Sequence, residues 1–340
     1  MDEGFPVEAE TLLPEGALPL DEQDRVLAMI RQKTEAALPK KEEEKTVKKT
    51  RFGLMLLAAA LVLGTVAASA AFQADGRIAR MLGVESESWQ EFLDGSGAAI
   101  QASQESNGWT LTLNQAVGDQ NCAYIMVDLT APEGTVLDAQ WYRLECKLDF
   151  DHGWSGGYGC SMMEDEDKTD NKVSFLLDVE RDQDLRGAKG RLTATEVVEF
   201  FSDDDFRVHD GMDWELDFTL RYKNDPIVYR PGQTVEVEGG TITVVKVEIT
   251  ALSARVKLTS KDGGLGRWEV GDIQKPLPVV TEMRMLDEEG NPIPVDSWGS
   301  HDSGRDGINT ATEHTMVFRP IIDPDRVTAL SIGGVVIPLK

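Results

Sequence analysis

Apolar and polar residues alternate with a period of two through most of the chain after residue 100. The clearest run has Trp214, Leu216, Phe218, Leu220 and Tyr222 separated by polar residues. Successive side chains of a β-strand point to opposite faces, so this pattern predicts a strand with one buried and one solvated face. Comparable segments predict further strands at Trp109–Leu113, Ile125–Leu129, Trp141–Asp149, Val173–Val179, Arg191–Phe201, Thr241–Thr250, Ala254–Ser260, Val279–Leu286, Thr315–Pro320 and Val335–Leu339.

These strands are separated by turns rich in Gly, Asp and Asn, and a short helix is expected before them, around Arg77–Leu93. Many short strands without intervening helices are typical of β-sandwiches. Residues 73–340 are too many for one sandwich of about 100 residues, and Asn224-Asp225-Pro226 offers a break. The expected fold is therefore mainly β, with two tandem β-sandwich domains at residues 73–224 and 225–340.

An uncharged stretch from Phe52 to Ala74 predicts one transmembrane helix over residues 52–72. About 20 helical residues cross a hydrocarbon core of roughly 30 Å. Six bases precede this stretch and two follow it, which places the N-terminus in the cytoplasm and the C-terminal domains outside the cell. Two alternatives remain. A buried core helix would normally show a polar stripe, and a signal peptide cleaved at Ala68-Ser69-Ala70 would normally have a shorter apolar run.

The cytoplasmic segment, residues 1–51, is expected to contain an amphipathic helix over residues 21–38, which Pro39 ends. Val26, Leu27 and Ile30 share its apolar side. A helix of this length is marginal alone in water, so that side needs something to contact. It either rests on membrane lipid or docks in the groove of a partner protein. The charged tether at residues 40–51 favours anionic lipid headgroups.

Charge and cysteine content narrow the classes of function. The net charge is −26, and residues 52–340 hold 48 acids and 25 bases, a net of −23. Such an excess repels phosphate backbones, so no direct nucleic-acid binding is expected. The three cysteines, Cys122, Cys146 and Cys160, allow at most one disulfide. Cys146 and Cys160 are the favoured pair because they are close in sequence.

Two short motifs resemble a catalytic serine site and a calcium-binding loop, and neither has the flanking secondary structure that such a site requires. Gly153–Gly157 fits G-x-S-x-G around Ser155, but a glycine-rich segment follows where a helix is needed. Asp302, Asp306 and Glu313 fit three positions of an EF-hand calcium loop, but strands rather than helices flank them. A flexible loop and an acidic surface loop are the alternative readings. We therefore expect no enzyme activity and no cofactor, with calcium as a weak candidate ligand.

Four places in the sequence carry a family resemblance. They are Leu20–Lys33 (LDEQDRVLAMIRQK), the span leading directly into a helix and strands, the pair Gly240–Val244 (GTITV) and Ile249–Val256 (ITALSARV), and Arg326–Leu339 (RVTALSIGGVVIPL). Together they resemble a Gram-positive bacterial family of membrane-bound anti-sigma-factor-like proteins, with an extracellular domain of unknown function followed by an immunoglobulin-like domain. In Ile249–Val256, Ala251 stands where the family usually has proline.

The resemblance implies that the chain is a transcription regulator. Its cytoplasmic helix would bind an extracytoplasmic-function sigma factor through Val26, Leu27 and Ile30, and its outer domains would sense an unidentified external signal. Residues 1–51 contain no His or Cys, which excludes a zinc-bound intracellular domain. The competing hypothesis is a membrane-anchored surface protein that acts in adhesion or ligand binding and has no sigma-factor role.

Overall fold

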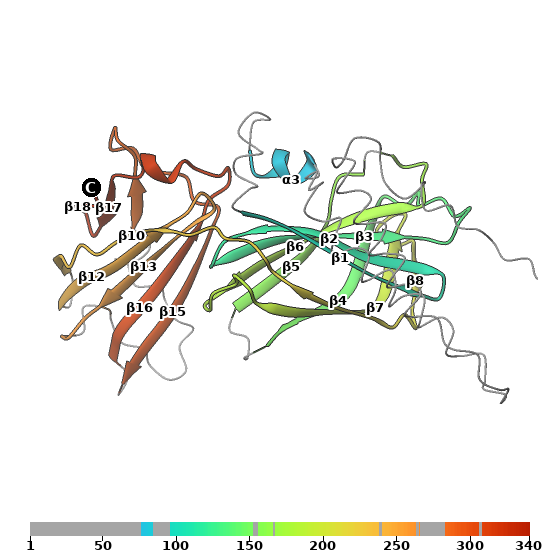
Figure 1. The fold of residues 1–340 in the computed structure, drawn as a ribbon, viewed down its shortest axis with the longest axis horizontal. Helices are drawn as coiled ribbons and strands as arrows, with labels where there is room; N and C mark the ends of the chain where they lie inside the picture. The colour runs from blue at the N-terminus through green and yellow to red at the C-terminus, as the bar shows by residue number, and fades with distance from the viewer. Residues whose placement is uncertain are drawn as a thin grey trace, which may run out of the picture. The chain divides into compact units, whose positions relative to one another are not determined.

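A computed structural model of the chain describes residues 76–83, 96–151, 156–165, 167–237, 240–262, 265, 283–305 and 308–340. Their fold is mainly β, as the alternating pattern predicts (Figure 1). The regular elements are α3 (Gly76–Met81), β1 (Gly97–Ser106), β2 (Trp109–Gly118), β3 (Cys122–Thr130), β4 (Trp141–Phe150), β5 (Gly156–Met162), β6 (Lys172–Arg181), β7 (Lys189–Phe200), β8 (Phe206–His209), β9 (Trp214–Thr219), β10 (Ile227–Tyr229), β11 (Thr234–Val237), β12 (Gly240–Ile249), β13 (Ser253–Thr259), β14 (Arg284–Leu286), β15 (Ser297–Arg305), β16 (Ile308–Val317), a 3-10 turn (Pro324–Arg326), β17 (Ala329–Ile332) and β18 (Val335–Pro338).

Strands β1 to β9, which we call the first module, form two antiparallel sheets. One has the order β1-β2-β3-β6-β5; in the other β4, β8 and β9 all pair with β7. Both sheets contribute to one apolar cluster, with Leu113 and Leu177 from the first and Leu192 and Trp214 from the second. Two sheets around a shared core fit a β-sandwich.

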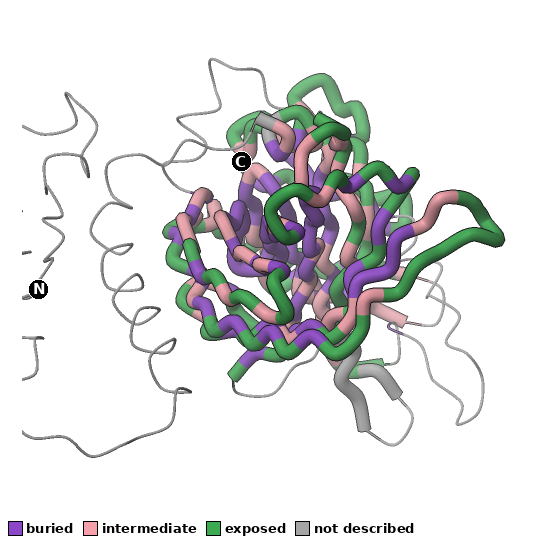
Figure 2. Tube along the Cα trace, turned by 90° about the vertical axis from the view of Figure 1, so that its right-hand side faces the viewer, coloured by how far each residue is buried: buried purple, intermediate pink, exposed green. Residues whose placement is uncertain are grey.

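Strands β10 to β18 are the second module. Its larger antiparallel sheet has the order β10-β12-β13-β16-β15, with β11 also paired to β12, and β14, β17 and β18 form a smaller sheet. A separate apolar cluster includes Ile242, Val256, Phe318 and Leu330. Buried residues lie in the interior of the β-rich part (Figure 2).

The buried positions agree with the apolar positions from which the strands were predicted. Trp214, Leu216, Phe218, Leu220 and Tyr222 are all buried, and the polar residues between them are exposed or half-buried. The alternation of apolar and polar residues therefore arises because one face of the strand packs on the core. β3 departs from the expected alternation, because its Tyr124 and Met126 are buried as well as its inward residues.

Several expectations concern residues beyond those described. The span at residues 52–72 and the helix at residues 21–38 both lie outside the described residues. Within the described residues, none of the helices has the length and apolarity needed to cross a bilayer. The helix expected at residues 77–93 begins as α3, Gly76–Met81, and is followed by a turn at Gly83 with φ +67°.

The proposed boundary at residues 224 and 225 lies between the two apolar clusters, the first of which reaches Tyr222 while the second begins at Val235. Contacts nevertheless group residues 73–340 into one compact unit. The division into two independent domains therefore stays a prediction.

Candidate functional site

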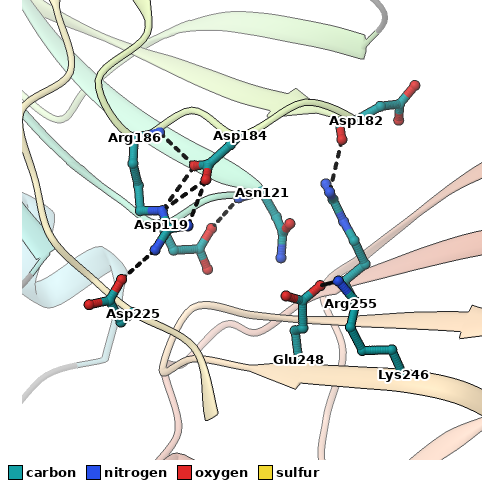
Figure 3. Close-up of polar contacts among 9 residues, drawn as sticks. All are labelled: Asp119, Asn121, Asp182, Asp184, Arg186, Asp225, Lys246, Glu248 and Arg255. Carbon is teal, nitrogen blue, oxygen red and sulfur yellow. Dashed lines mark hydrogen bonds and ion pairs between the residues drawn. The ribbon is translucent and has the colours of Figure 1, made fainter. Parts of the chain in front are cut away.

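A buried polar junction connects the two modules, and Asp119 lies at its centre (Figure 3). Asp119 follows β2 in the turn that leads to β3. One carboxylate oxygen accepts hydrogen bonds from the backbone N–H groups of Asn121 at 2.7 Å and Cys122 at 2.9 Å. This local arrangement is an Asx turn, which explains why Asp suits the position.

The other carboxylate oxygen of Asp119 reaches the second module. It accepts hydrogen bonds from the hydroxyls of Thr250 and Ser253, both at 2.5 Å. These two residues flank the turn between β12 and β13, and the Asn121 amide also donates to the Ser253 hydroxyl at 2.8 Å. All four residues are almost completely buried. A carboxylate buried away from water needs hydrogen-bond donors, and here the two modules supply them together.

Arg255 on β13 makes the second connection. Its guanidinium donates to the backbone carbonyls of Arg181 and Asp182, each at 2.8 Å, at the end of β6. A third connection is the hydroxyl of Ser297, which donates to the Glu180 carboxylate at 2.5 Å. Hydrogen bonds to charged groups contribute more to stability than those between neutral groups, so these contacts stabilise the junction.

Helix α3, the element that follows the uncharged stretch in sequence, and the turn after it together contact both modules. The Arg77 guanidinium donates to the Ser174 hydroxyl of β6 at 3.0 Å. On the other side, the backbone N–H of Ile321 donates to the carbonyl of Leu82 at 2.9 Å. Ile78 and Leu82 are fully buried. A change in how the modules meet would therefore act on α3.

A pocket of about 270 Å³ opens at this junction. It is lined by Asn121, Gly156, Gly157, Glu180, Arg181, Asp182, Arg255, Gly299, Ser300, Glu313 and Thr315. The side-chain oxygen of Asn121 is buried and has no hydrogen-bond partner among the described residues. Such an acceptor, beside carboxylates and guanidinium groups, gives the pocket the chemistry to hold a small polar ligand.

The ionisable groups around the junction have altered proton affinities. Burial raises the pKa of the Asp178 carboxyl above its usual value, although the nearby Arg319 partly offsets this. Burial likewise raises the pKa of Tyr124, next to Arg319. At Glu313, burial alone would raise the pKa. The hydrogen bond from Lys257 at 2.7 Å and the nearby positive charges together outweigh burial and leave the pKa lowered.

Of the residues singled out from sequence, Glu313 lines the junction pocket. Val26, Leu27, Ile30 and Ser155 lie outside the described residues. Cys146 and Cys160 are free thiols on β4 and β5.

The calcium candidates lie on the β15–β16 hairpin instead of one continuous loop. Asp302 pairs with Thr312 in the register, Glu313 pairs with His301, and Asp306 is outside the described residues. Clusters of three or more His, Cys, Asp or Glu suited to a metal do not occur among the described residues.

The junction residues Asp119, Asn121 and Arg255 were not predicted from the sequence. Asp119 and Asn121 look like ordinary turn residues, and only the contact with Thr250, 131 positions away, gives them their role. One signal was present: Thr250, Ser253 and Arg255 all fall within the ITALSARV motif that carries part of the family resemblance.

Comparisons with known proteins give little functional information. No family model matches the chain, and no curated protein matches it. Among solved structures, the chain resembles a conserved domain protein from Bacillus anthracis, with 18% identity, a TM-score of 0.44, and coverage of 69% of this chain and 75% of that one.

Proposed function

We propose that the chain is a single-pass membrane regulator that binds an extracytoplasmic-function sigma factor and responds to an external signal. Its cytoplasmic helix at residues 21–38 would bind the sigma factor through Val26, Leu27 and Ile30. Its two β-modules, which we propose are immunoglobulin-like domains outside the cell, would receive the signal. We assign the chain no catalytic role.

One structural observation carries this proposal. α3 follows the proposed span directly in sequence; Ser174 of the first module contacts the helix, and Ile321 of the second contacts the turn that follows it. A regulator that transmits an external event needs its sensing part to be connected to the segment that enters the membrane. The buried junction supplies such a connection, because polar networks of this kind favour discrete arrangements over gradual deformation.

The pocket supports the sensing half of the proposal. It opens between the modules, where a ligand would contact Glu180 and Asp182 of the first and Arg255 and Glu313 of the second. A ligand that fits one arrangement of the modules better than another shifts the population toward it. The signal would then reach α3 through the same contacts.

The test of the sigma-factor role uses the full chain carried in a Gram-positive cell. Purification from membranes should recover a sigma factor with the wild-type chain, whereas Leu27→Asp and Ile30→Asp should each abolish its recovery, because a charge on the apolar side prevents burial in a groove. Gln32→Asp, on the opposite side of the expected helix, should leave recovery unchanged. Recovery of no sigma factor with the wild-type chain would contradict the proposal.

The pocket also favours a second candidate function, a membrane-anchored surface protein that binds a ligand and has no partner in the cytoplasm. The two functions differ in what the N-terminal segment does. Deletion of residues 1–38 should abolish the cellular response if the chain is a regulator. It should leave ligand binding and the phenotype unchanged if the chain is only an anchored surface protein.

A further inference from the structure

Strands β4 and β5 meet at one edge of the first module. Each is the outermost strand of its own sheet. They approach each other through side chains: the Tyr158 hydroxyl donates to the carbonyl of Cys146 at 2.9 Å, and the backbone N–H of Tyr142 donates to the sulfur of Met162 at 3.3 Å. The two sheets are therefore closed at this edge by isolated contacts instead of a backbone ladder.

Cys146 of β4 and Cys160 of β5 lie at this edge. Both are half-buried and packed against the apolar cluster of the first module. Their thiols are hydrogen-bonded to each other, and this interaction shifts the pKa of both. The two thiols are thus close enough for either one to attack a mixed disulfide formed on the other.

The third cysteine has a different environment. Cys122 is completely buried at the start of β3, beside Asp119, and burial raises the pKa of its thiol. A thiol that is inaccessible and held in its protonated form reacts slowly with oxidants. The structure therefore separates one reactive pair from one inert cysteine.

We propose that Cys146 and Cys160 form a redox site that closes the edge of the first module with a disulfide between its two sheets. The oxidant is a small-molecule disulfide. The thiolate of one of the two cysteines attacks one sulfur of that disulfide, forming a mixed disulfide and releasing one thiol. The other cysteine then loses its proton and attacks the protein sulfur of the mixed disulfide, which releases the second thiol. Two protein thiols are oxidised, the oxidant is reduced to two thiols, and the two protons pass to them.

The bond would change how firmly β5 is held. This strand contains three glycines, Gly156, Gly157 and Gly159, and its side chains are exposed except for the half-buried Cys160 and Met162. Glycine weakens a strand because it loses more backbone freedom on folding and offers nothing to pack. Gly156 and Gly157 also line the junction pocket. Oxidation would therefore stabilise one wall of the pocket, and this inference holds whether or not the chain binds a sigma factor.

The experiment uses the full chain, purified in detergent with all thiols reduced and then exposed to oxidised glutathione. After denaturation and alkylation, the reduced chain should show three modified cysteines and the oxidised chain one. Peptide mapping should show Cys146 linked to Cys160, with Cys122 alkylated. Three alkylated cysteines after oxidation, or a bond that includes Cys122, would overturn the proposal.

Single variants test whether each thiol resolves an adduct on the other. Cys160→Ser should trap a stable glutathione adduct on Cys146, because the thiol that resolves it is missing, and Cys146→Ser should likewise trap one on Cys160. Cys122→Ala should still form the disulfide and retain no free thiol. Formation of an internal disulfide in Cys146→Ser or Cys160→Ser would show that Cys122 takes part and would contradict the proposal.

Discussion

Arg255 is a charged residue at a buried contact, and its surroundings account for its burial. Its side chain is 9% exposed, and its two terminal nitrogens donate to the carbonyls of Arg181 and Asp182 in the other module. Five N–H donors in a planar group allow one arginine to satisfy several backbone acceptors at once. The residue therefore acts as a connector between the two modules.

Arg255→Met tests this role, since it keeps much of the stem and removes the donors. We expect the free energy of unfolding to fall by about 2–4 kcal/mol, because two carbonyls lose their charged donor in a buried setting. Urea unfolding of the purified chain measures the change. Arg230→Met, at an exposed position, is the matched control and should change stability by less than about 0.5 kcal/mol. Equal effects of the two variants would contradict the connector role.

The ionisation of Glu313 should make the free energy of unfolding depend on pH. Burial would raise its folded pKa, but the hydrogen bond from Lys257 together with nearby positive charges lowers it below the unfolded value of about 4.3. Its stabilising contribution is therefore complete above the unfolded pKa and is lost as the pH falls through the folded pKa. The Glu313 side chain is 33% exposed, so the effect should be below about 1 kcal/mol. Urea unfolding at pH 6 and pH 3 should show a smaller difference for Glu313→Gln than for the wild type, and an unchanged difference would contradict the assignment.

Among the strands, the packing between β7 and β9 depends on a glycine. Gly190 pairs with Phe218 in the register and with Phe150 on the other side. A Cβ at Gly190 would overlap the ring of Phe218. The two phenylalanine rings meet edge to face with their centroids 5.9 Å apart, so neither can move aside without loss of packing.

Gly190→Ala should therefore destabilise the chain by about 1–3 kcal/mol, the usual cost of overpacking. Gly157→Ala is the matched control, because Gly157 is also a strand glycine and has open space where a Cβ would lie. It should be neutral or slightly stabilising, since alanine reduces the freedom of the unfolded chain. Thermal unfolding of both variants checks the contrast. A stable Gly190→Ala variant would show that the Phe218 ring can relocate.

The same elements show which strands a sequence can predict. β9 is predictable because each inward residue is large and apolar and each outward residue is polar, so burial leaves a direct pattern. β5 is missed because its exposed glycines carry no such pattern, and its pairing with β6 alone makes it a strand. β1 is missed for a similar reason, since Ala98 and Ala102 are its only buried residues among small and polar neighbours.

At the scale of the whole molecule, the junction could not be predicted from sequence for a physical reason. The side chain of Asp119 forms its local turn with Asn121 and Cys122, which any Asp in a turn can do. Its role between the modules arises only when Thr250 and Ser253 approach it, more than 130 positions away. The local pattern therefore predicts the strands whose inward residues are large and apolar, and it contains no information about how the modules meet.

Loss of the Asp119 contact should make unfolding of the two modules less cooperative. Asp119→Ala would leave the hydroxyls of Thr250 and Ser253 and two backbone N–H groups buried without their acceptor, at a cost of about 3 kcal/mol or more. Each module has an apolar cluster of its own, so loss of the junction should let them unfold separately. Calorimetry should show one transition for the wild type and two for Asp119→Ala. Asp204→Ala, at an exposed turn, should keep the single transition. One shifted transition for Asp119→Ala would mean that Arg255 and Ser297 suffice to couple the modules.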